Sequence, residues 1–198
     1  YTIQLVNGAL LAELTQITVV ADFRSRDIAA GGQGAPLVPA FHEAVFKHSN
    51  CHRVIVNIGG IANITNLDPY HPIIGFDCGP GNLLMDAWCL RHTGKTYDNN
   101  GQWAATGRII PALLEALLSD YFFLRQPPKS TGRDLFNVHW LEKNLMGNEA
   151  PEDVQATLLQ LTVITIARSI DEYCPTAEEV YICGGGAHNT LLIDRLIG

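Results

Sequence analysis

Several features that mark large protein classes are absent from this sequence of 198 residues. It has no apolar run near the ~20 residues that a membrane span requires, and no charged-then-apolar signal pattern at its start. It also has no tract of Lys and Arg, and its net charge is −7. Binding nucleic acid requires clustered basic residues that neutralise phosphates. We therefore expect neither a membrane protein nor a nucleic-acid-binding protein.

Paired cysteines and metal-binding motifs are also missing. The five cysteines lie at positions 51, 78, 89, 174 and 183, an odd number with no C-x-x-C pair. We interpret them as reduced thiols of a cytoplasmic protein without a zinc site. No set of His, Cys and carboxylate residues has the spacing of metal ligands, so the sequence predicts no protein metal ligands.

Three well-known catalytic or nucleotide-binding motifs are absent as well. The segment Gln126-Pro127-Pro128-Lys129-Ser130-Thr131-Gly132 contains Lys-Ser but lacks the preceding glycines of a P-loop. Gly184-Gly185-Gly186-Ala187 lacks the glycine spacing of a dinucleotide site, and no G-x-S-x-G nucleophile elbow occurs. A nucleotide, if bound, has to be held in another way.

The composition, with 47% hydrophobic and 17% charged residues, is typical of a globular protein with a substantial core. Apolar periodicity predicts helices over residues 37–47, 83–92, 111–124 and 151–173 and a final helix capped by Asn189. Strands are predicted over residues 2–5, 17–21, 54–58, 61–67, 72–76 and 180–183. Residues 61–67 return directly after the Gly59-Gly60 turn, so the α/β fold should contain a mixed sheet.

Glycine-rich turns follow three of the predicted strands. They are Asn57-Ile58-Gly59-Gly60, Asp77-Cys78-Gly79-Pro80-Gly81-Asn82 and Cys183-Gly184-Gly185-Gly186. Glycine permits positive φ and close approach of backbone to a ligand, and backbone N–H groups in such turns can hold phosphate. Each turn alone is also explained as a tight turn. Three of them in one domain favour a nucleotide cleft.

Asp77 is the candidate catalytic carboxylate, because it follows an apolar strand and precedes residues that cannot form a helix. At a strand end facing a cleft it could act as a general base; alternatively it binds amides of its own loop. Asp86 lies in the first turns of the next predicted helix, where the helix dipole explains it. We expect Asn82 to cap that helix, Gly94 to end it, and His42 to be structural.

Two polar segments have two interpretations each. Asp22 and Asp27 alternate with Arg24 and Arg26, which predicts either surface ion pairs or an arm that binds a polar, anionic ligand. Residues 129–133 form either a mobile polar loop near phosphate or a solvated connection.

These residues together resemble the anhydro-N-acetylmuramic acid kinase family. The matching runs occur in order and cover nearly the whole chain. They are Ala21-Asp22-Phe23-Arg24, residues 26–42, residues 57–63, residues 75–82 with Met85-Asp86-Ala87-Trp88, residues 128–133, and residues 183–189.

The resemblance implies the fold of sugar kinases, Hsp70 and actin, in which two RNase H-like domains with mixed sheets and flanking helices close on ATP and substrate. Residues 1–50 would be the C-terminal part of the first, sugar-side domain. Residues 51–198 would be the second, nucleotide-binding domain, truncated at its C-terminal end. Related sugar kinases often form homodimers, although the sequence leaves the oligomeric state open.

The family's activity is the ATP-dependent opening of 1,6-anhydro-N-acetylmuramic acid by water, which yields N-acetylmuramic acid 6-phosphate and ADP in cytoplasmic peptidoglycan recycling. The implied cofactors are ATP and Mg²⁺, since phosphoryl transfer needs charge neutralisation. Mg²⁺ should be held largely by ATP and water.

The resemblance also implies roles for individual residues. Asp77 would activate water for attack at C1 of the sugar, and the released O6 would take the phosphoryl group. The nucleotide side would comprise Asn57, Gly59, Gly60, Asn63, Gly79, Gly81, Asn82, Gly184, Gly185, Gly186 and Asn189. The sugar side would comprise Arg24, Asp27, Gly32, Gln33 and Gly34.

The chain departs from the family in one respect that bears on activity. Family members begin with a Gly-Thr-Ser-x-Asp-Gly loop that wraps phosphate from the first domain, and this stretch and the final C-terminal portion are missing here. Together with a start at Tyr1, this predicts a fragment. Two alternatives therefore stay open: a binding module without activity, which ATP titration would detect, and a hydrolase that uses Asp77 without ATP, which the product's mass would identify.

Overall fold

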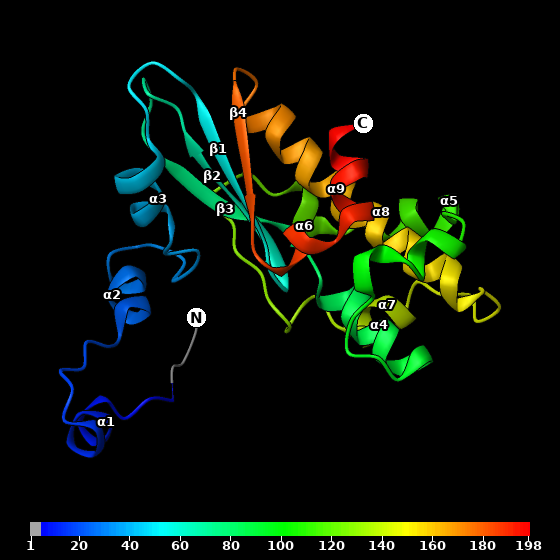
Figure 1. The fold of residues 1–198 in the computed structure, drawn as a ribbon, viewed down its shortest axis with the longest axis horizontal. Helices are drawn as coiled ribbons and strands as arrows, with labels where there is room; N and C mark the ends of the chain where they lie inside the picture. The colour runs from blue at the N-terminus through cyan, green and yellow to red at the C-terminus, as the bar shows by residue number, and fades with distance from the viewer. Residues whose placement is uncertain (1–4) are drawn as a thin grey trace.

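The computed structural model describes residues 5–198, in which a four-stranded sheet carries helices on both faces (Figure 1). The strands are β1 (Arg53–Ile58), β2 (Ile61–Leu67), β3 (Ile74–Pro80) and β4 (Glu179–Cys183). The α-helices are α1 (Gly8–Thr15), α2 (Phe23–Ala29), α3 (Pro39–Phe46), α4 (Leu83–Thr93), α5 (Pro111–Leu118), α6 (Tyr121–Leu124), α7 (Val138–Glu142), α8 (Pro151–Tyr173) and α9 (Thr190–Ile197). Short 3₁₀ turns are η1 (Asn99–Gly101), η2 (Ala104–Thr106) and η3 (Gly185–His188).

The sheet is mixed, as the sequence predicts. Its strand order is β3-β2-β1-β4, with β1–β2 and β2–β3 antiparallel and β1–β4 parallel. The Gly59-Gly60 turn closes the β1–β2 hairpin, and the predicted strands at 54–58, 61–67 and 180–183 are confirmed within one residue. The third strand begins two residues later than predicted and runs on to Pro80, because Asp77 and Gly79 pair with β2. Asp77 therefore lies within a strand, and not in a loop after it.

The long helix α8 covers one face of the sheet, and its bounds match the prediction. Pro151 occupies its first turn together with Glu152 and Asp153, where a free N–H is not needed and the helix dipole favours anions. Its apolar side chains join the inward residues of β1, β2 and β3 in one core. The fully buried members include Val54, Val56, Ile58, Ile64, Phe76, Leu158, Leu159, Leu161 and Ile166.

Helix α3 packs against the opposite face. Thr65 and Ile64 are neighbours on β2 and so point to opposite faces; Ile64 joins the α8 core, whereas the Thr65 hydroxyl lies 2.8 Å from Nδ1 of His42 on α3. His42 is buried, so its predicted structural role is confirmed. Apolar periodicity, which predicts this helix, would place Phe41 and Val45 on a buried face, but these side chains remain 59% and 55% exposed.

Two further predictions differ from the structure. Residues 17–21 form no strand, because they have no neighbouring strand to pair with in the part of the chain that the structure describes. The predicted strand at 2–5 lies outside the described residues except for Leu5, which is in no element. The predicted helix at 111–124 is broken after Leu118, because the side chain of Asp120 accepts a bond from Phe122 N and starts a new helix, α6.

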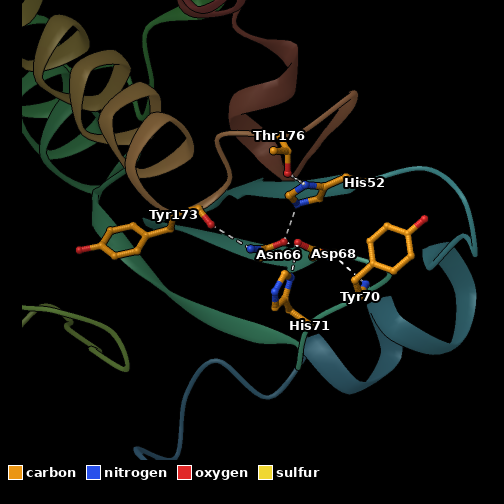
Figure 2. Close-up of polar contacts among 7 residues, drawn as sticks. All are labelled: His52, Asn66, Asp68, Tyr70, His71, Tyr173 and Thr176. Carbon is orange, nitrogen blue, oxygen red and sulfur yellow. Dashed lines mark hydrogen bonds and ion pairs between the residues drawn. The ribbon is translucent and has the colours of Figure 1, made fainter.

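The end of the sheet at which β1 begins and β2 ends is fixed by a buried polar network (Figure 2). Asn66 Nδ2 donates to the carbonyl of Tyr173 at the end of α8, and its Oδ1 accepts from Asp68 N. The same Oδ1 lies 2.7 Å from His52 Nε2, so this nitrogen carries a proton. His52 Nδ1 in turn lies 2.8 Å from the Thr176 hydroxyl. The network ties α8 to both hairpin strands.

Between residues 5 and 198, none of the helices combines the length and the apolar character that crossing a membrane requires.

Candidate functional site

Three of the predicted site residues form one polar row across the sheet. Strand pairing places Asn57 opposite Asn63, and Asn63 opposite Asp77. Directly opposed residues in antiparallel strands share a face, and Asn63 shares the face of Thr65, two residues along β2. The row therefore lies on the α3 side of the sheet, between α3 and the glycine turns. The α8 face carries the apolar core instead.

Asp77 is the one carboxylate of this row, and it is 5% exposed. Its Oδ2 accepts hydrogen bonds from Thr131 N at 2.8 Å and Ser130 Oγ at 3.0 Å. Burial raises the pKa of Asp77, while these two bonds and the positive charge of Arg24 lower it in part. The donors come from another segment, so the interpretation that Asp77 binds amides of its own loop is wrong.

Two buried oxygen atoms next to Asp77 lack a hydrogen-bond partner. They are Oδ1 of Asn63, opposite Asp77 on β2, and Oγ1 of Thr131, whose N–H binds Asp77. Neither has a donor or acceptor among residues 5–198. Buried polar atoms are almost always paired. Two such oxygens without partners beside a buried carboxylate therefore indicate a place for a hydroxyl or water ligand.

The segment that follows α6 is buried at Lys129 and is not a solvated connection there. Lys129 is 4% exposed, its Nζ lies 4.9 Å from the centroid of the Phe122 ring, and its carbonyl accepts from Asp77 N at 3.1 Å. Burial lowers the pKa of Lys129. The interpretation as a solvated connection is therefore wrong for residues 129–131, because these residues bond to β3. A polar loop near phosphate stays a prediction.

The first two glycine turns bind each other through their backbones. Gly81 N and Leu83 N donate to the carbonyl of Gly60, and Asn82 N donates to that of Gly59. A Cβ at Gly81 would lie 2.4 Å from the Gly59 oxygen, so glycine is needed for this approach. Asn82 is predicted to cap α4. It occupies the position before the helix, but its side chain makes no capping bond, and its Nδ2 donates to the carbonyl of Ile58 instead. The predicted helix end at Gly94 is confirmed.

The third glycine turn packs against the same hairpin. Gly184 has a φ of 84°, and a Cβ there would lie 2.6 Å from Asn57 Oδ1. A Cβ on Gly186 would lie 2.3 Å from the Ile58 side chain. Asn189 caps α9 by accepting from Leu192 N, as predicted. The three turns thus meet around the end of β1.

A cavity of about 430 Å³ lies beside these turns. Three of the predicted nucleotide-side residues, Asn82, Gly185 and Asn189, line it. Asn57, Asn63 and Asp77 are not part of its lining. The rest of its lining had not been predicted as nucleotide-side: Met85, Asp86, Thr96, Tyr97, Asp98, Asn99, Asn100 and His188. The run of polar turn residues at 96–100 was the only signal in the sequence that could have indicated the missed wall.

The two carboxylates of this cavity differ in their partners. Asp98 accepts from Trp103 N and Ala104 N, both at 2.9 Å, and so fixes η2. The carboxylate of Asp86 accepts no hydrogen bond from the described residues; burial and the charge of Asp98 raise its pKa to about 6. The helix dipole therefore does not suffice to explain Asp86, which is held in the cavity wall at an electrostatic cost.

The predicted sugar-side residues hold one loop together. Arg24 Nη1 donates to the carbonyl of Gly34, and Asp27 Oδ2 accepts from Gly34 N at 2.7 Å. No ion pair joins Asp22 or Asp27 to Arg24 or Arg26 within the described chain, so the surface ion-pair interpretation is wrong. The positive charge of Arg24 lowers the pKa of Asp77, so this loop lies near the Asp77 carboxylate.

Three of the predicted site residues neither donate to the Asp77 carboxylate nor line the cavity. Gln33 is exposed, and Gly32 donates its N–H to the carbonyl of Asp27 within the same loop. Gly79 is buried in β3, where a Cβ would lie 2.8 Å from the Phe123 ring. Packing therefore accounts for Gly79 without a ligand. No group of three or more metal-binding side chains gathers within residues 5–198.

The fold and the site define an α/β protein with a mixed sheet, in which a buried carboxylate lies near a cavity bordered by glycine turns. Comparison with known proteins gives the family. The family model described as anhydro-N-acetylmuramic acid kinase matches residues 1–198. The chain therefore belongs to the anhydro-N-acetylmuramic acid kinase family, a family of the sugar kinase type.

Curated relatives agree with this family. Proteins named anhydro-N-acetylmuramic acid kinase from Nitrosomonas europaea and Nitrosospira multiformis are 65% and 63% identical over 196 residues. One from Pseudomonas fluorescens is 58% identical over 198 residues. Each comparison covers 99% of this chain and 54% of the relative. The chain thus spans about half the length of the curated relatives it matches.

Proposed function

We propose that the whole protein to which this chain belongs is an ATP-dependent kinase. It opens 1,6-anhydro-N-acetylmuramic acid with water and phosphorylates O6, giving N-acetylmuramic acid 6-phosphate and ADP. Membership of the family supports the substrates and the reaction type. The observation that carries the proposal is the buried Asp77 carboxylate with the unpaired oxygens of Asn63 and Thr131 beside it.

Asp77 acts as the general base in this proposal. Its carboxylate takes a proton from water while the water oxygen bonds to C1 of the sugar. The C1–O6 bond breaks, and O6 then bonds to the γ-phosphorus as ADP leaves. The raised pKa of Asp77 suits this role, because a base whose pKa lies closer to the working pH accepts the proton more readily. The oxygens of Asn63 and Thr131 can accept the hydrogen bonds of the water or of a sugar hydroxyl.

The glycine turns and the adjoining cavity form the proposed nucleotide site. Close backbone approach at Gly184 and Gly186 leaves peptide N–H groups without Cβ atoms around them, which suits phosphate. The cavity bordered by Asn82, Gly185 and Asn189 would take the nucleoside. Bound there, ATP supplies the phosphoryl group. Mg²⁺ would come with the phosphates and water, since it retains several water ligands in such sites.

The first 50 residues supply the proposed sugar side. Arg24 and Asp27 hold the Gly34 loop, and the charge of Arg24 acts on Asp77. The mixed sheet, with α8 and α3 on opposite faces, is compatible with an RNase H-like domain of the sugar kinase, Hsp70 and actin fold. A cytoplasmic setting is part of the proposal and agrees with the five free cysteines. A homodimer is also part of the proposal.

The test is an Asp77→Asn variant of the chain extended to the full length of its family. We expect turnover of ATP with the anhydro sugar to fall on the order of 10²–10⁴-fold, the effect of losing a general base. Calorimetric ATP binding should persist, because Asp77 does not line the cavity. Asp171→Asn, an exposed position on α8, is the matched control.

Mass spectrometry of the product identifies the reaction. A product that gains water and a phosphoryl group supports the kinase, and one that gains water alone indicates a hydrolase. Near-normal turnover of Asp77→Asn would remove Asp77 as the base. Absence of ATP binding in the extended protein would leave a sugar-binding module.

A further inference from the structure

Three consecutive residues fasten Asp77 to the segment after α6. The Lys129 carbonyl accepts from Asp77 N at 3.1 Å, Ser130 Oγ donates to Asp77 Oδ2 at 3.0 Å, and Thr131 N donates to the same Oδ2 at 2.8 Å. We call residues 129–131 the Asp77 strap. It binds both the backbone and the carboxylate of one residue.

The two donors reach one oxygen of the carboxylate. Both bonds go to Oδ2, and Oδ1 accepts no hydrogen bond from any residue between 5 and 198. A carboxylate oxygen that already accepts two bonds is a weaker proton acceptor than a free one, because the donors stabilise its negative charge. The two oxygens of Asp77 are therefore chemically unequal.

We propose that Ser130 is a positioning residue for the ring-opening step. With the Thr131 N–H it fixes Oδ2, sets the rotation of the carboxylate, and leaves Oδ1 as the atom that takes the proton from water. This rests on the proposed role of Asp77 as the base. Ser130 touches neither reacting atom and acts through Asp77.

The strap itself is held firmly enough for this purpose. Lys129 is buried, its Nζ donates to the carbonyl of Phe122 at 3.4 Å, and it lies over the Phe122 ring. Phe122 is also buried and contacts Phe136 edge-on at 5.4 Å between ring centroids. The position of Ser130 is thus fixed from the core beneath α6 as well as by its bonds to β3.

Ser130 also influences when the base is ionised. Its bond lowers the pKa of Asp77 against the raising effect of burial. Removing the hydroxyl should therefore raise the pKa of Asp77 further. Since the base works only when ionised, the acid side of the rate profile should move to higher pH. A role for Ser130 in folding alone would lower stability but would not shift this profile.

The first experiment needs no activity. In the chain of 198 residues, the carboxyl ¹³C resonance of Asp77, assigned by its loss in Asp77→Asn, is followed through a pH titration. Ser130→Ala should shift the Asp77 titration to higher pH. Ser130→Thr keeps a hydroxyl and should restore the wild-type curve. Ser119→Ala removes a hydroxyl that donates to the carbonyl of Ala116, and serves as the matched control.

The second experiment measures kcat/KM against pH in the chain extended to family length. For Ser130→Ala we expect a loss of roughly tenfold on the acid side, the size of one hydrogen bond to a charged group, and a smaller loss that persists at high pH because the rotation of the carboxylate is no longer set. Thermal unfolding of each variant shows whether the fold is retained.

The outcomes separate this inference from the proposed function. A shifted titration together with a shifted acid limb supports Ser130 as a positioning residue. An unmoved Asp77 titration in folded Ser130→Ala overturns it, even if turnover falls. If Asp77→Asn keeps its turnover, the proposed base is wrong, and the role of Ser130 in that step falls with it whatever the titration shows.

Discussion

Asp77 and Asp86 are both carboxylates with raised pKa values, but their surroundings differ. Asp77 is buried in the sheet and receives two hydrogen bonds that offset part of the burial. Asp86 faces the cavity near Asp98 and receives none from the described residues. A buried carboxylate without donors destabilises the folded state when it is ionised. Residues kept at such a cost are typical of ligand sites.

Replacing Asp86 should therefore stabilise the protein at neutral pH. The pKa of Asp86 in the folded protein, about 6, exceeds the ordinary value of 3.8. Folding therefore becomes more favourable as the pH falls from about 6 toward 3.8. We expect Asp86→Asn to raise the free energy of unfolding by about 1 kcal/mol near neutral pH, a figure reduced for its partial exposure.

Urea unfolding near pH 7.5 and near pH 5 checks this prediction. The gain of Asp86→Asn over wild type should shrink at the lower pH, where wild type is partly protonated. Asp134→Asn, at an exposed position, should show neither effect. A gain that stays the same at both pH values would contradict the electrostatic explanation.

Strand register is the feature at the scale of elements that assembles the site. Asn57, Asn63 and Asp77 are separated in sequence, and pairing of β1 with β2 and β2 with β3 places them in one row. A slip of one residue would turn each side chain to the other face. The α8 core holds the register from one face. The network around Asn66 holds it at the other end of the strands (Figure 2).

Removing the Asn66 side chain should loosen the end of the hairpin away from the site. Asn66→Ala leaves the Tyr173 carbonyl, the Asp68 N–H and His52 Nε2 without their partner. Each unpaired buried group costs about 1–3 kcal/mol. We expect a loss on the order of 3 kcal/mol in the free energy of unfolding.

Chemical denaturation measures this loss, with Asn148→Ala as an exposed asparagine control. Amide hydrogen exchange should accelerate first at the end of α8 and at β1 and β2. Equal stability of Asn66→Ala and the control would show that the network is not needed to fix the strands.

The molecule as a whole is uneven in its packing. Every member of the buried core cluster comes from residue 54 onward. Of residues 5–50, Gly34 and His42 alone are buried, while large apolar side chains such as Leu14, Val20 and Phe23 are 62–74% exposed. Figure 1 shows α1 and α2 extending away from the sheet, on the side of α3 and far from α8. The division after residue 50 that the sequence predicts remains a prediction, and this packing supports it.

A chain of residues 51–198 should consequently fold by itself. We expect cooperative thermal unfolding with a midpoint within roughly 10 °C of the intact chain, since a loss of 1 kcal/mol shifts a domain of this size by about 2–8 °C. The loss arises where α3 leaves the sheet and frees Thr65 from His42. Light scattering should also show less association, because exposed apolar surface is removed. A gradual, uncooperative transition would contradict an independent unit.

The sequence alone determined the α/β class, the hairpin at Gly59-Gly60, the bounds of α8 and the three glycine turns, because each depends on local periodicity or on glycine's backbone freedom. It also made Asp77 the candidate base by residue type, a role that stays a prediction, although it placed Asp77 in a loop and not in β3. It did not predict the break in residues 111–124, since this depends on one side-chain cap at Asp120. It also did not predict that α3 meets the sheet through a buried histidine, His42, which contacts Thr65.

The tertiary structure alone decided which groups meet. Long-range pairing extended β3 through Asp77 and set it beside Asn63, and the packing of Lys129 brought Ser130 and Thr131 onto its carboxylate. The same packing made Asp86 and residues 96–100 walls of a cavity. Burial and proximity between distant segments fix these pKa shifts and hydrogen bonds. Burial and proximity are not encoded in the local pattern of residues, so the pKa shifts and hydrogen bonds follow only once the chain has folded.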